Sequence, residues 1–467
     1  MVLMKEEETE KENKEGPKEN EAGSQEDEKE QVKEGKDTKE REAPKTRQIT
    51  TKFSAIIAGG SIPAPEVVDK MIEDALQHRA SDIHIEPQHE DVTVRFRIDG
   101  VLYEVGKIPK TNYENILNRV KVQAHLRVDE HFSAQDGSLR HEVGDDIIDV
   151  RISIVPTIEG EKIVMRMLAV YVPNLSMGDL GVSEDDQKKL LKAIKKPFGM
   201  ILAVGPTGSG KTTTLYALLK TFDSSEINLT TIEDPVEYKI AGANQIQVNL
   251  QTNLTFAKGL RSIVRQDPDV ILVGEIRDNE TAEIAVNAAL TGHLLFSSFH
   301  ANDAATGIPR LLDMGIEPFL LASTLEIIAA QRLVRKICEK CKYKKTTTID
   351  EIEKFLPGVG KFFPQKSFTT YAGRGCPSCS NKGYQGRTAI YEIINITPEM
   401  EDLILKNPSS QEISEFARKQ GSRSLFEDGL DKVMKGITTP QELLRVASPP
   451  EIEHFIVKNK PVPDEKK

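Results

Sequence analysis

The stretch Met200-Ile-Leu-Ala-Val-Gly-Pro-Thr-Gly-Ser-Gly-Lys-Thr212 decides the fold, because it joins an apolar run to a glycine-rich loop. The loop matches the pattern G-x-x-x-x-G-K-[S/T] in full. In such loops the glycines let backbone N–H groups approach phosphate oxygens, and the following helix directs its positive N-terminus at the same anion. The apolar run predicts a strand before the loop and a helix is expected after it, so a purely structural glycine turn is the weaker reading. We therefore predict a nucleotide site here.

The residues of this loop have distinct expected roles. Lys211 is expected to neutralise charge on the β- and γ-phosphates of ATP, and the Thr212 hydroxyl to ligate Mg²⁺. The predicted ATP-binding residues are Gly205, Pro206, Thr207, Gly208, Ser209, Gly210, Lys211, Thr212 and Thr213.

Two carboxylates follow at predicted strand ends. The segment Val270-Ile-Leu-Val-Gly-Glu275 is an apolar strand that ends in a glutamate, and parallel strands present their carboxyl ends to the ligand. The segment Thr231-Ile-Glu-Asp-Pro-Val-Glu237 adds an acidic cluster that a bound divalent cation would make tolerable. We predict that Thr212, Glu275 and Glu233 hold Mg²⁺ or its water shell, with Glu233 the preferred partner of the attacking water. An ordinary strand-end glutamate and an acidic surface turn are the alternatives.

Two histidines bracket a further strand whose end faces the same site. His300 follows Phe299 and is expected to sense the γ-phosphate through a hydrogen bond. His293 precedes the strand and is the weaker candidate, because a lone histidine is more often structural.

The region around the loop predicts an α/β fold. Strands and helices alternate after residue 183, which favours a parallel sheet covered on both faces. The expected strands are Met200–Val204, Leu229–Glu233, Gln245–Val248, Val270–Val273 and Leu294–Ser298, and the expected helices are Thr255–Gln266, Thr281–Leu290 and Asp303–Leu312. Upstream, two helices, five strands and a turn at Asp99-Gly100 predict a smaller α+β domain. The expected strands are Ser81–Glu86, Val92–Ile98, Val101–Val105, Ile147–Val155 and Lys162–Leu168, and the expected helices are Val67–Leu76 and Tyr113–Ala124.

The charge pattern divides the rest of the chain. Through Arg47 the sequence has 16 acidic and 11 basic residues and no aromatic residue, which predicts a disordered tail. The expected parts are an acidic tail (1–50), the α+β domain (51–172), a linker (173–182), the ATPase core (183–331), a cysteine-bearing insert (332–395) and a helical C-terminal segment (396–467).

Composition also bears on where the protein works. The N-terminus shows no signal peptide, and the apolar runs are too short to span a bilayer. We therefore expect a cytoplasmic protein with peripheral membrane association only. The net charge of −11, without a long basic stretch, argues against nucleic acid as the main partner.

The four cysteines form two C-x-x-C units, Cys338 with Cys341 and Cys376 with Cys379. Four thiolates suit a structural Zn²⁺ ion in a reducing compartment better than they suit disulfides. The 34 residues between the pairs exceed the commonest zinc-ribbon spacing, so free buried thiols remain the alternative.

The order of these motifs resembles the secretion ATPases that drive type II secretion and type IV pilus assembly. The loop is similar to their Walker A motif, and Ile232–Tyr238 resembles their aspartate box. Gly259–Asp278 resembles their Walker B region, and Thr291–Ala304 their histidine box. Upstream, Ala80–Pro87 and Arg95–Gly100 resemble the N-terminal domain of that family, so the resemblance covers about residues 53 to 450.

This resemblance implies a RecA-like core, a smaller PAS-like N-terminal domain and a homo-hexameric ring. It also implies arginines that reach the ATP: Arg151 and Arg166 from the N-terminal domain, and Arg261 and Arg265 from the core. A surface ion pair is the alternative for each of them. The tetracysteine insert is similar to that of assembly-type members. The implied partner is an inner-membrane platform protein, although only the acidic tail precedes Thr51 here, whereas such members usually carry a further docking domain.

We therefore expect a hexameric motor that hydrolyses ATP to drive assembly of a type IV pilus or a pilus-like filament. The alternative within the same class is a type II secretion ATPase. Two other classes are weaker: a nucleotide-binding scaffold that has lost turnover, which intact Lys211, Thr212 and Glu275 disfavour, and a DNA-translocating motor, which the missing basic patch disfavours.

Overall fold

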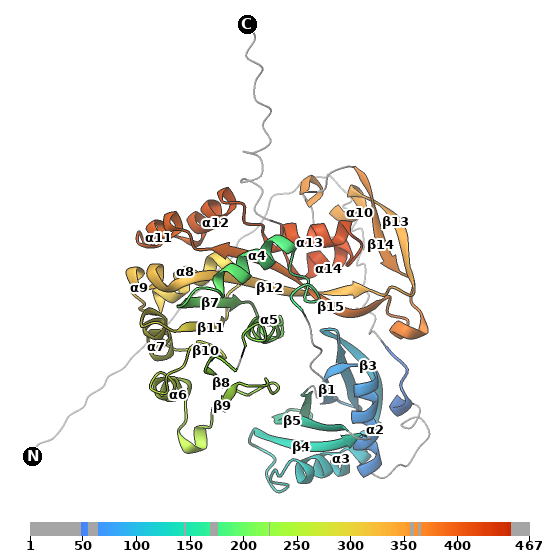
Figure 1. Cartoon of the computed structure of the whole chain (residues 1–467). Helices are drawn as coiled ribbons and strands as arrows, with labels where there is room; N and C mark the ends of the chain where they lie inside the picture. Colours follow the sequence, from blue (N-terminus) through green and yellow to red (C-terminus); the bar gives the residue numbers. More distant parts are fainter. Residues whose placement is uncertain are drawn as a thin grey trace, which may run out of the picture. The chain divides into compact units, whose positions relative to one another are not determined.

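The computed structural model describes residues 48–54, 64–143, 146–168, 176–223, 225–354, 359–362 and 366–449 (Figure 1). The expected acidic tail lies outside the described residues except for its last three positions. The same holds for the start of the expected linker, residues 173–175, and for residues 450–467.

The N-terminal domain is one antiparallel sheet with two helices. Its strands run in the order β3-β2-β1-β6-β5-β4. Helices α2 and α3 pack against each other, and α2 also contacts β1. The elements are α2 (Ala64–Gln77), β1 (Ala80–Pro87), β2 (Asp91–Ile98), β3 (Val101–Pro109), α3 (Lys110–Gln123), β4 (Gln135–Val143), β5 (Asp146–Thr157) and β6 (Gly160–Met167).

The ATPase core is a seven-stranded sheet in the order β15-β12-β7-β11-β10-β8-β9. All neighbours are parallel except β12 and β15, which are antiparallel. The central strands are buried along their whole length, as strands covered on both faces should be. The strands are β7 (Gly199–Val204), β8 (Leu229–Glu233), β9 (Asn244–Gln247), β10 (Val270–Val273), β11 (Leu294–Phe299), β12 (Leu325–Ile337) and β15 (Tyr384–Asn395).

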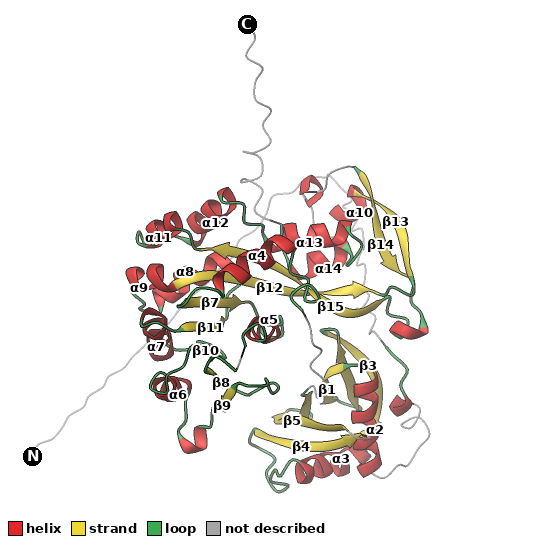
Figure 2. Cartoon of the chain, in the orientation of Figure 1, coloured by secondary structure: helices red, strands yellow, loops and turns green. Residues whose placement is uncertain are grey.

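Helices cover both faces of this sheet (Figure 2). Side chains of α4 and α5 pack on one face in one apolar cluster, and those of α6 to α9 pack on the other face in a second cluster. The elements are α4 (Glu184–Ala193), α5 (Lys211–Leu219), the 3₁₀ turn η1 (Leu250–Thr252), α6 (Phe256–Ile263), α7 (Asn279–Leu290), α8 (Ala304–Asp313) and α9 (Pro318–Thr324).

The sheet continues beyond residue 331, where we expected the core to end. Strand β12 runs on to Ile337, and β15 returns from the cysteine-bearing segment to pair with it. The pairing is strong because both strands bury long apolar runs. Between them lie β13 (Lys342–Thr348), α10 (Ile349–Glu353), η2 (Val359–Phe362), β14 (Ser367–Gly373) and η3 (Pro377–Cys379), and after them come α11 (Pro398–Ile404), α12 (Ser410–Lys419), α13 (Leu425–Met434) and α14 (Pro440–Val446).

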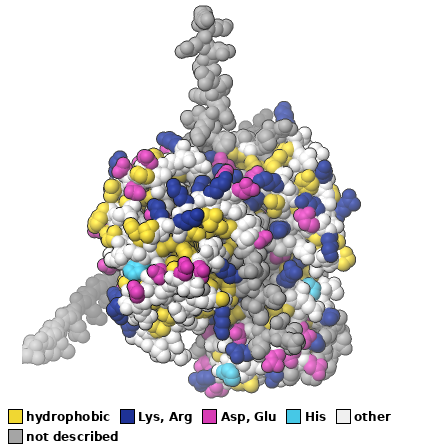
Figure 3. All heavy atoms as spheres, in the orientation of Figure 1, with side chains coloured by type: hydrophobic (Ala, Val, Ile, Leu, Met, Phe, Trp, Pro, Cys, Tyr) yellow, Lys and Arg dark blue, Asp and Glu magenta, His cyan; other side chains and the backbone are white. Residues whose placement is uncertain are grey.

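The surface carries both signs of charge. On the face shown in Figure 3, basic and acidic side chains are interspersed. None of the described helices is long and apolar enough to cross a lipid bilayer.

Candidate functional site

The glycine-rich loop connects the buried strand β7 to the N-terminus of α5, as the sequence predicts. Gly210 immediately precedes the helix with φ 88°, a left-handed conformation that favours glycine. Gly205 has φ 151°, and a Cβ there would lie 2.7 Å from the carbonyl oxygen of Gln331. The loop therefore needs glycine at both ends, and its exposed middle, Pro206 to Gly208, is open to a ligand.

Lys211 folds back over this loop. Its Nζ donates hydrogen bonds to the carbonyl oxygens of Gly205 at 2.9 Å and Pro206 at 3.2 Å. Burial lowers the pKa of Lys211, the charge of Glu275 opposes that shift, and the charge of Arg332 adds to it. A buried ammonium held only by carbonyl dipoles is well suited to an anionic ligand such as a phosphate.

Gln331, on the strand beside β7, stabilises the loop through a hydrogen bond. This residue of β12 is 1% exposed, and its Nε2 donates a 2.6 Å hydrogen bond to the carbonyl oxygen of Ser209. Its Oε1 and the Ser209 hydroxyl are both buried and form no hydrogen bond among the described residues. The adjacent strand thus holds the loop through a side chain that the motif itself does not contain.

Glu275 and His300 meet at the carboxyl end of the sheet. His300 Nε2 lies 3.3 Å from Glu275 Oε2, a hydrogen bond in which the imidazole N–H donates to the carboxylate. The other oxygen of Glu275 pairs with Arg277, which raises the pKa of that guanidinium. The structure therefore joins two of the predicted catalytic residues within electrostatic reach of Lys211.

Glu233 is also at this edge, but neutral donors occupy its carboxylate. It is 2% exposed and accepts hydrogen bonds from Tyr216, from Thr231 Oγ1 at 2.7 Å and from Gln245 Nε2 at 3.2 Å. Tyr216 lies on α5, the helix that follows the glycine-rich loop. This hydrogen bond therefore connects the acidic segment to that helix. For Glu233 to orient water or Mg²⁺, one of these donors must give way.

Arg151 and Arg166 face each other across β5 and β6 in the N-terminal domain. Nε of Arg166 lies 3.0 Å from Asp82 Oδ1. Burial raises the pKa of Glu237, and the charges of Arg151 and Arg166 partly offset that shift. These two arginines therefore lie near the acidic segment that contains Glu233.

The other predicted residues form contacts outside the glycine-rich loop. Arg261 on α6 forms an exposed ion pair with Glu280 at 2.6 Å, and Arg265 is bonded to Ser262 at 3.4 Å. Nδ1 of His293 donates a 2.8 Å hydrogen bond to the carbonyl oxygen of Ala288.

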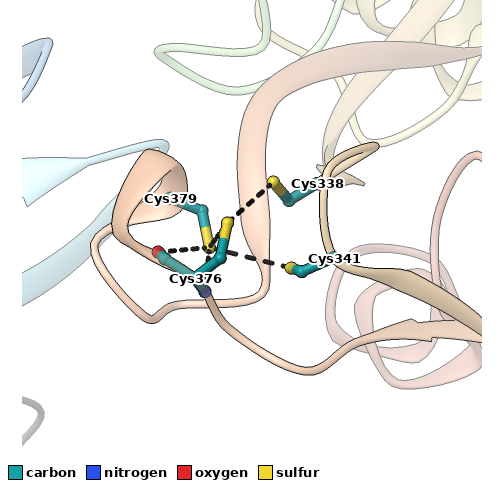
Figure 4. A group of neighbouring side chains, drawn as sticks. All are labelled: Cys338, Cys341, Cys376 and Cys379. Atoms are coloured by element: carbon teal, nitrogen blue, oxygen red, sulfur yellow. Dashed lines mark hydrogen bonds between the residues drawn. The ribbon is translucent and has the colours of Figure 1, made fainter.

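The four cysteines converge, although Cys341 and Cys376 are far apart in sequence (Figure 4). Their sulfur atoms all lie within 4.8 Å of one another, and three pairs are 3.8–3.9 Å apart. Four sulfurs at about 2.3 Å from a tetrahedral Zn²⁺ would be separated by about 3.8 Å. Burial opposes ionisation of Cys379, but the backbone N–H groups of Cys376 and Gly383 lower its pKa to about 7. The donor set therefore fits zinc.

A family profile described as "Type II/IV secretion system protein" matches residues 58–445, a span that contains every motif above. The chain belongs to this family.

Curated relatives of this secretion-family chain carry two kinds of name. It is 46% identical over 384 residues to a type II secretion system protein E of Pseudomonas aeruginosa, covering 82% of this chain and 75% of the relative. It is 44% identical over 395 residues to the type IV pilus assembly ATPase PilB of Myxococcus xanthus, covering 84% and 69%.

Solved structures support the fold of this family member. The Legionella pneumophila ATPase DotB has a TM-score of 0.60 at 20% identity, with 82% of this chain and 95% of that chain covered. The pilus retraction motor PilT with ADP has a TM-score of 0.54 at 23% identity, with 83% and 98% covered. The predicted α/β fold and the predicted family are confirmed.

Sequence reasoning missed several residues that shape the site of this family member. Three residues outside the quoted motifs each bond a predicted site residue elsewhere in the sequence: Gln331, Tyr216 and Gln245. The signal available for Gln331 was a polar residue directly after the apolar run Ile327–Ala330 of that strand.

Proposed function

We propose that this chain hydrolyses ATP to ADP and phosphate and couples the reaction to assembly of a type IV pilus or a related filament. The observation that carries the proposal is the convergence of the phosphate loop, Lys211, Glu275 and His300 at one edge of the core sheet. A relative named type IV pilus assembly ATPase, matched over most of the chain, supports the same activity.

Each group of residues has a separate role in the proposed reaction. The loop N–H groups and the N-terminus of α5 bind the phosphates, and Lys211 exchanges its carbonyl partners for phosphate oxygens. Glu275, oriented by His300 and Arg277, polarises the attacking water in place of Glu233, because neutral donors already occupy the Glu233 carboxylate. Arg151 and Arg166 supply positive charge to the phosphoryl group from the N-terminal domain, and Arg261 and Arg265, exposed on α6, are suited to act on a neighbouring subunit.

Two metals belong to this proposal. Thr212, Glu275 and Glu233 would hold Mg²⁺, which would neutralise negative charge on the phosphates of ATP. Cys338, Cys341, Cys376 and Cys379 would hold a structural Zn²⁺ whose binding free energy stabilises the segment between β12 and β15.

The alternative within the same activity is type II secretion, and a relative named type II secretion system protein E supports it as well. In either case we infer a homo-hexamer at the cytoplasmic face of the inner membrane, acting on a platform protein. A set of prepilin and platform genes beside this gene would favour the pilus system.

Substitution of Lys211 tests the activity. Lys211→Ala should abolish Mg²⁺-dependent release of phosphate from ATP, because no other cation replaces it inside the loop. Glu275→Gln should retain ATP binding and lose at least about a hundredfold in kcat. Lys258→Ala, an exposed lysine on α6, is the matched control and should be unchanged. Near-normal phosphate release by Lys211→Ala would refute the mechanism.

A further inference from the structure

Arg332 is a cation beside the phosphate site that no motif assigns. We propose that Arg332 binds the γ-phosphate of ATP from within the same chain, as a second cation beside Lys211. This inference rests on the proposed ATPase function and adds a substrate-binding residue to it.

Arg332 lies at the edge of the sheet from which the glycine-rich loop emerges. Strand β12 pairs with β7 as far as Ala330 opposite Val204, the last residue before the phosphate loop. Gln331 and Arg332 therefore continue alongside the loop. Gln331 turns to Ser209 inside the loop, whereas Nη2 of Arg332 donates a 2.8 Å hydrogen bond to the carbonyl oxygen of Asn302. Asn302 lies two residues after His300. Arg332 therefore connects the strand beside the glycine-rich loop to the loop that contains His300 and Asn302.

Arg332 forms no ion pair among the described residues, and only the charge of Asp303 opposes the effect of burial on its pKa. Among the described residues its buried Nε has no hydrogen-bond partner, and its Nη2 donates to a carbonyl oxygen rather than to a carboxylate. The nearby Asp303 is committed elsewhere, because its Oδ1 accepts hydrogen bonds from the Thr306 backbone N–H at 2.7 Å and hydroxyl at 2.5 Å as the cap of α8. The next arginine on the strand, Arg335, does have a buried glutamate partner in Glu442.

The buried ammonium of Lys211 and the half-buried guanidinium of Arg332 therefore act on each other at this edge of the sheet. Burial lowers the pKa of Arg332, and burial also lowers that of Lys211, whose shift Arg332 increases. Like charges in a poorly solvated place cost free energy, and a polyanion placed between them relieves that cost. The γ-phosphate is the ligand group that reaches past Lys211 toward Glu275 and His300. A planar guanidinium with an unused Nε–H is suited to bind two of its oxygens.

Arg310 provides a matched comparison. Its Nη1 donates to the carbonyl oxygen of His300, and its guanidinium lies 5.3 Å from the Phe299 ring centroid. Arg310 thus fixes the same loop as Arg332, but it is not among the charges that act on Lys211. A loss caused by loosening the loop should appear in both variants, whereas loss of a γ-phosphate contact should appear only in the Arg332 variants.

The experiment compares binding of a non-hydrolysable ATP analogue and of ADP, each with Mg²⁺, to the full-length chain. Arg332→Gln should weaken the ATP analogue at least tenfold more than ADP, and Arg332→Lys should show a smaller preference of the same sign. Arg310→Gln should change both affinities by the same factor. Melting curves identify misfolded variants, and if Arg332→Gln does not fold, Arg332→Lys carries the test.

The outcomes separate this inference from the proposed function. If the wild-type chain binds neither nucleotide, the ATPase proposal fails. If the wild type binds both nucleotides but the Arg332 variants change the two affinities equally, or not at all, Arg332 only tethers Asn302 and the inference is wrong.

Discussion

At the scale of single residues, the hydrogen bond from Gln331 to Ser209 connects the nucleotide site to the strand beside it. Gln331→Met keeps the size of the side chain and removes the donor, which leaves the Ser209 carbonyl without its partner. An unsatisfied buried carbonyl costs about 1–3 kcal/mol. Because that cost falls on the conformation of the loop, we expect the Kd for ADP to rise about tenfold while kcat at saturating ATP falls less than about threefold.

A second variant separates positioning from general packing. Gln331→Glu keeps the shape but has no donor when ionised, and it regains one when protonated. Its ADP affinity should therefore be poor at pH 8 and improve toward pH 6, relative to the wild type measured at each pH. The same affinity at both pH values, or intact binding by Gln331→Met, would show that this hydrogen bond does not position the loop.

At the scale of the elements, Glu392 makes the packing of β15 against α8 sensitive to pH. Burial raises the pKa of Glu392 from 4.5 to about 8, and the charges of Asp303 and Glu427 add to the increase. The backbone N–H of Ala304 and the charge of Arg418 partly oppose it. The folded chain keeps this proton up to about pH 8, and the unfolded chain releases it near 4.5. Stability is therefore lost as pH rises from about 4.5 to about 8.

Replacing Glu392 with glutamine should remove this loss. We expect Glu392→Gln to be at least about 1 kcal/mol more stable than the wild type at pH 8 and much closer to it at pH 6. Thermal unfolding at the two pH values measures the difference, and Glu283→Gln, an exposed position on α7, is the control. An equal effect at both pH values would mean that Glu392 is ionised throughout the range.

The tetracysteine segment connects the two strands at the edge of the core sheet. If the four sulfurs hold zinc, one Zn²⁺ per chain should co-purify, and Cys338→Ser should lose it and melt several degrees lower. Metal analysis by mass spectrometry measures the ratio, and Ser380→Ala beside the cluster is the control. A gently purified wild-type sample without zinc would count against the site.

At the scale of the whole molecule, Arg151 and Arg166 come from a different domain than the phosphate loop. Closure of that domain over ATP should be more persistent when neighbouring subunits restrict it, because packing raises the local concentration of the arginines. We therefore expect specific ATPase activity to increase with protein concentration as hexamers form. Arg166→Ala should lower kcat at least about tenfold and leave nucleotide binding largely intact.

A dilution series with light-scattering mass at each concentration measures this dependence. Arg140→Ala, at an exposed arginine on β4 of the same sheet, is the control for Arg166→Ala. Constant activity in a sample that is monomeric throughout would mean that the ring is not needed for the chemistry, and the role of both arginines would be wrong.

How far the sequence predicts the molecule depends on whether a feature is local. The phosphate loop is specified by contiguous residues, since its glycines and the start of α5 need only their neighbours to adopt their backbone conformations. The two C-x-x-C units are likewise local signals. The buried strands of the core were predicted because their apolar runs stand out, whereas β4, a polar strand at the edge of its sheet, was missed for the opposite reason.

The sequence by itself determined the fold class, the glycine-rich loop, the strand-end Glu275 and the two C-x-x-C units. Only the tertiary structure decided what surrounds them: that Gln331 bonds Ser209 from 122 positions away, that Tyr216 bonds Glu233, and that the charge of Arg332 acts on Lys211. The physical reason is that a motif encodes backbone conformation over a few residues, whereas these contacts depend on strand order and register. Burial of apolar side chains over the whole sheet determines strand order and register, and no short stretch of sequence specifies either.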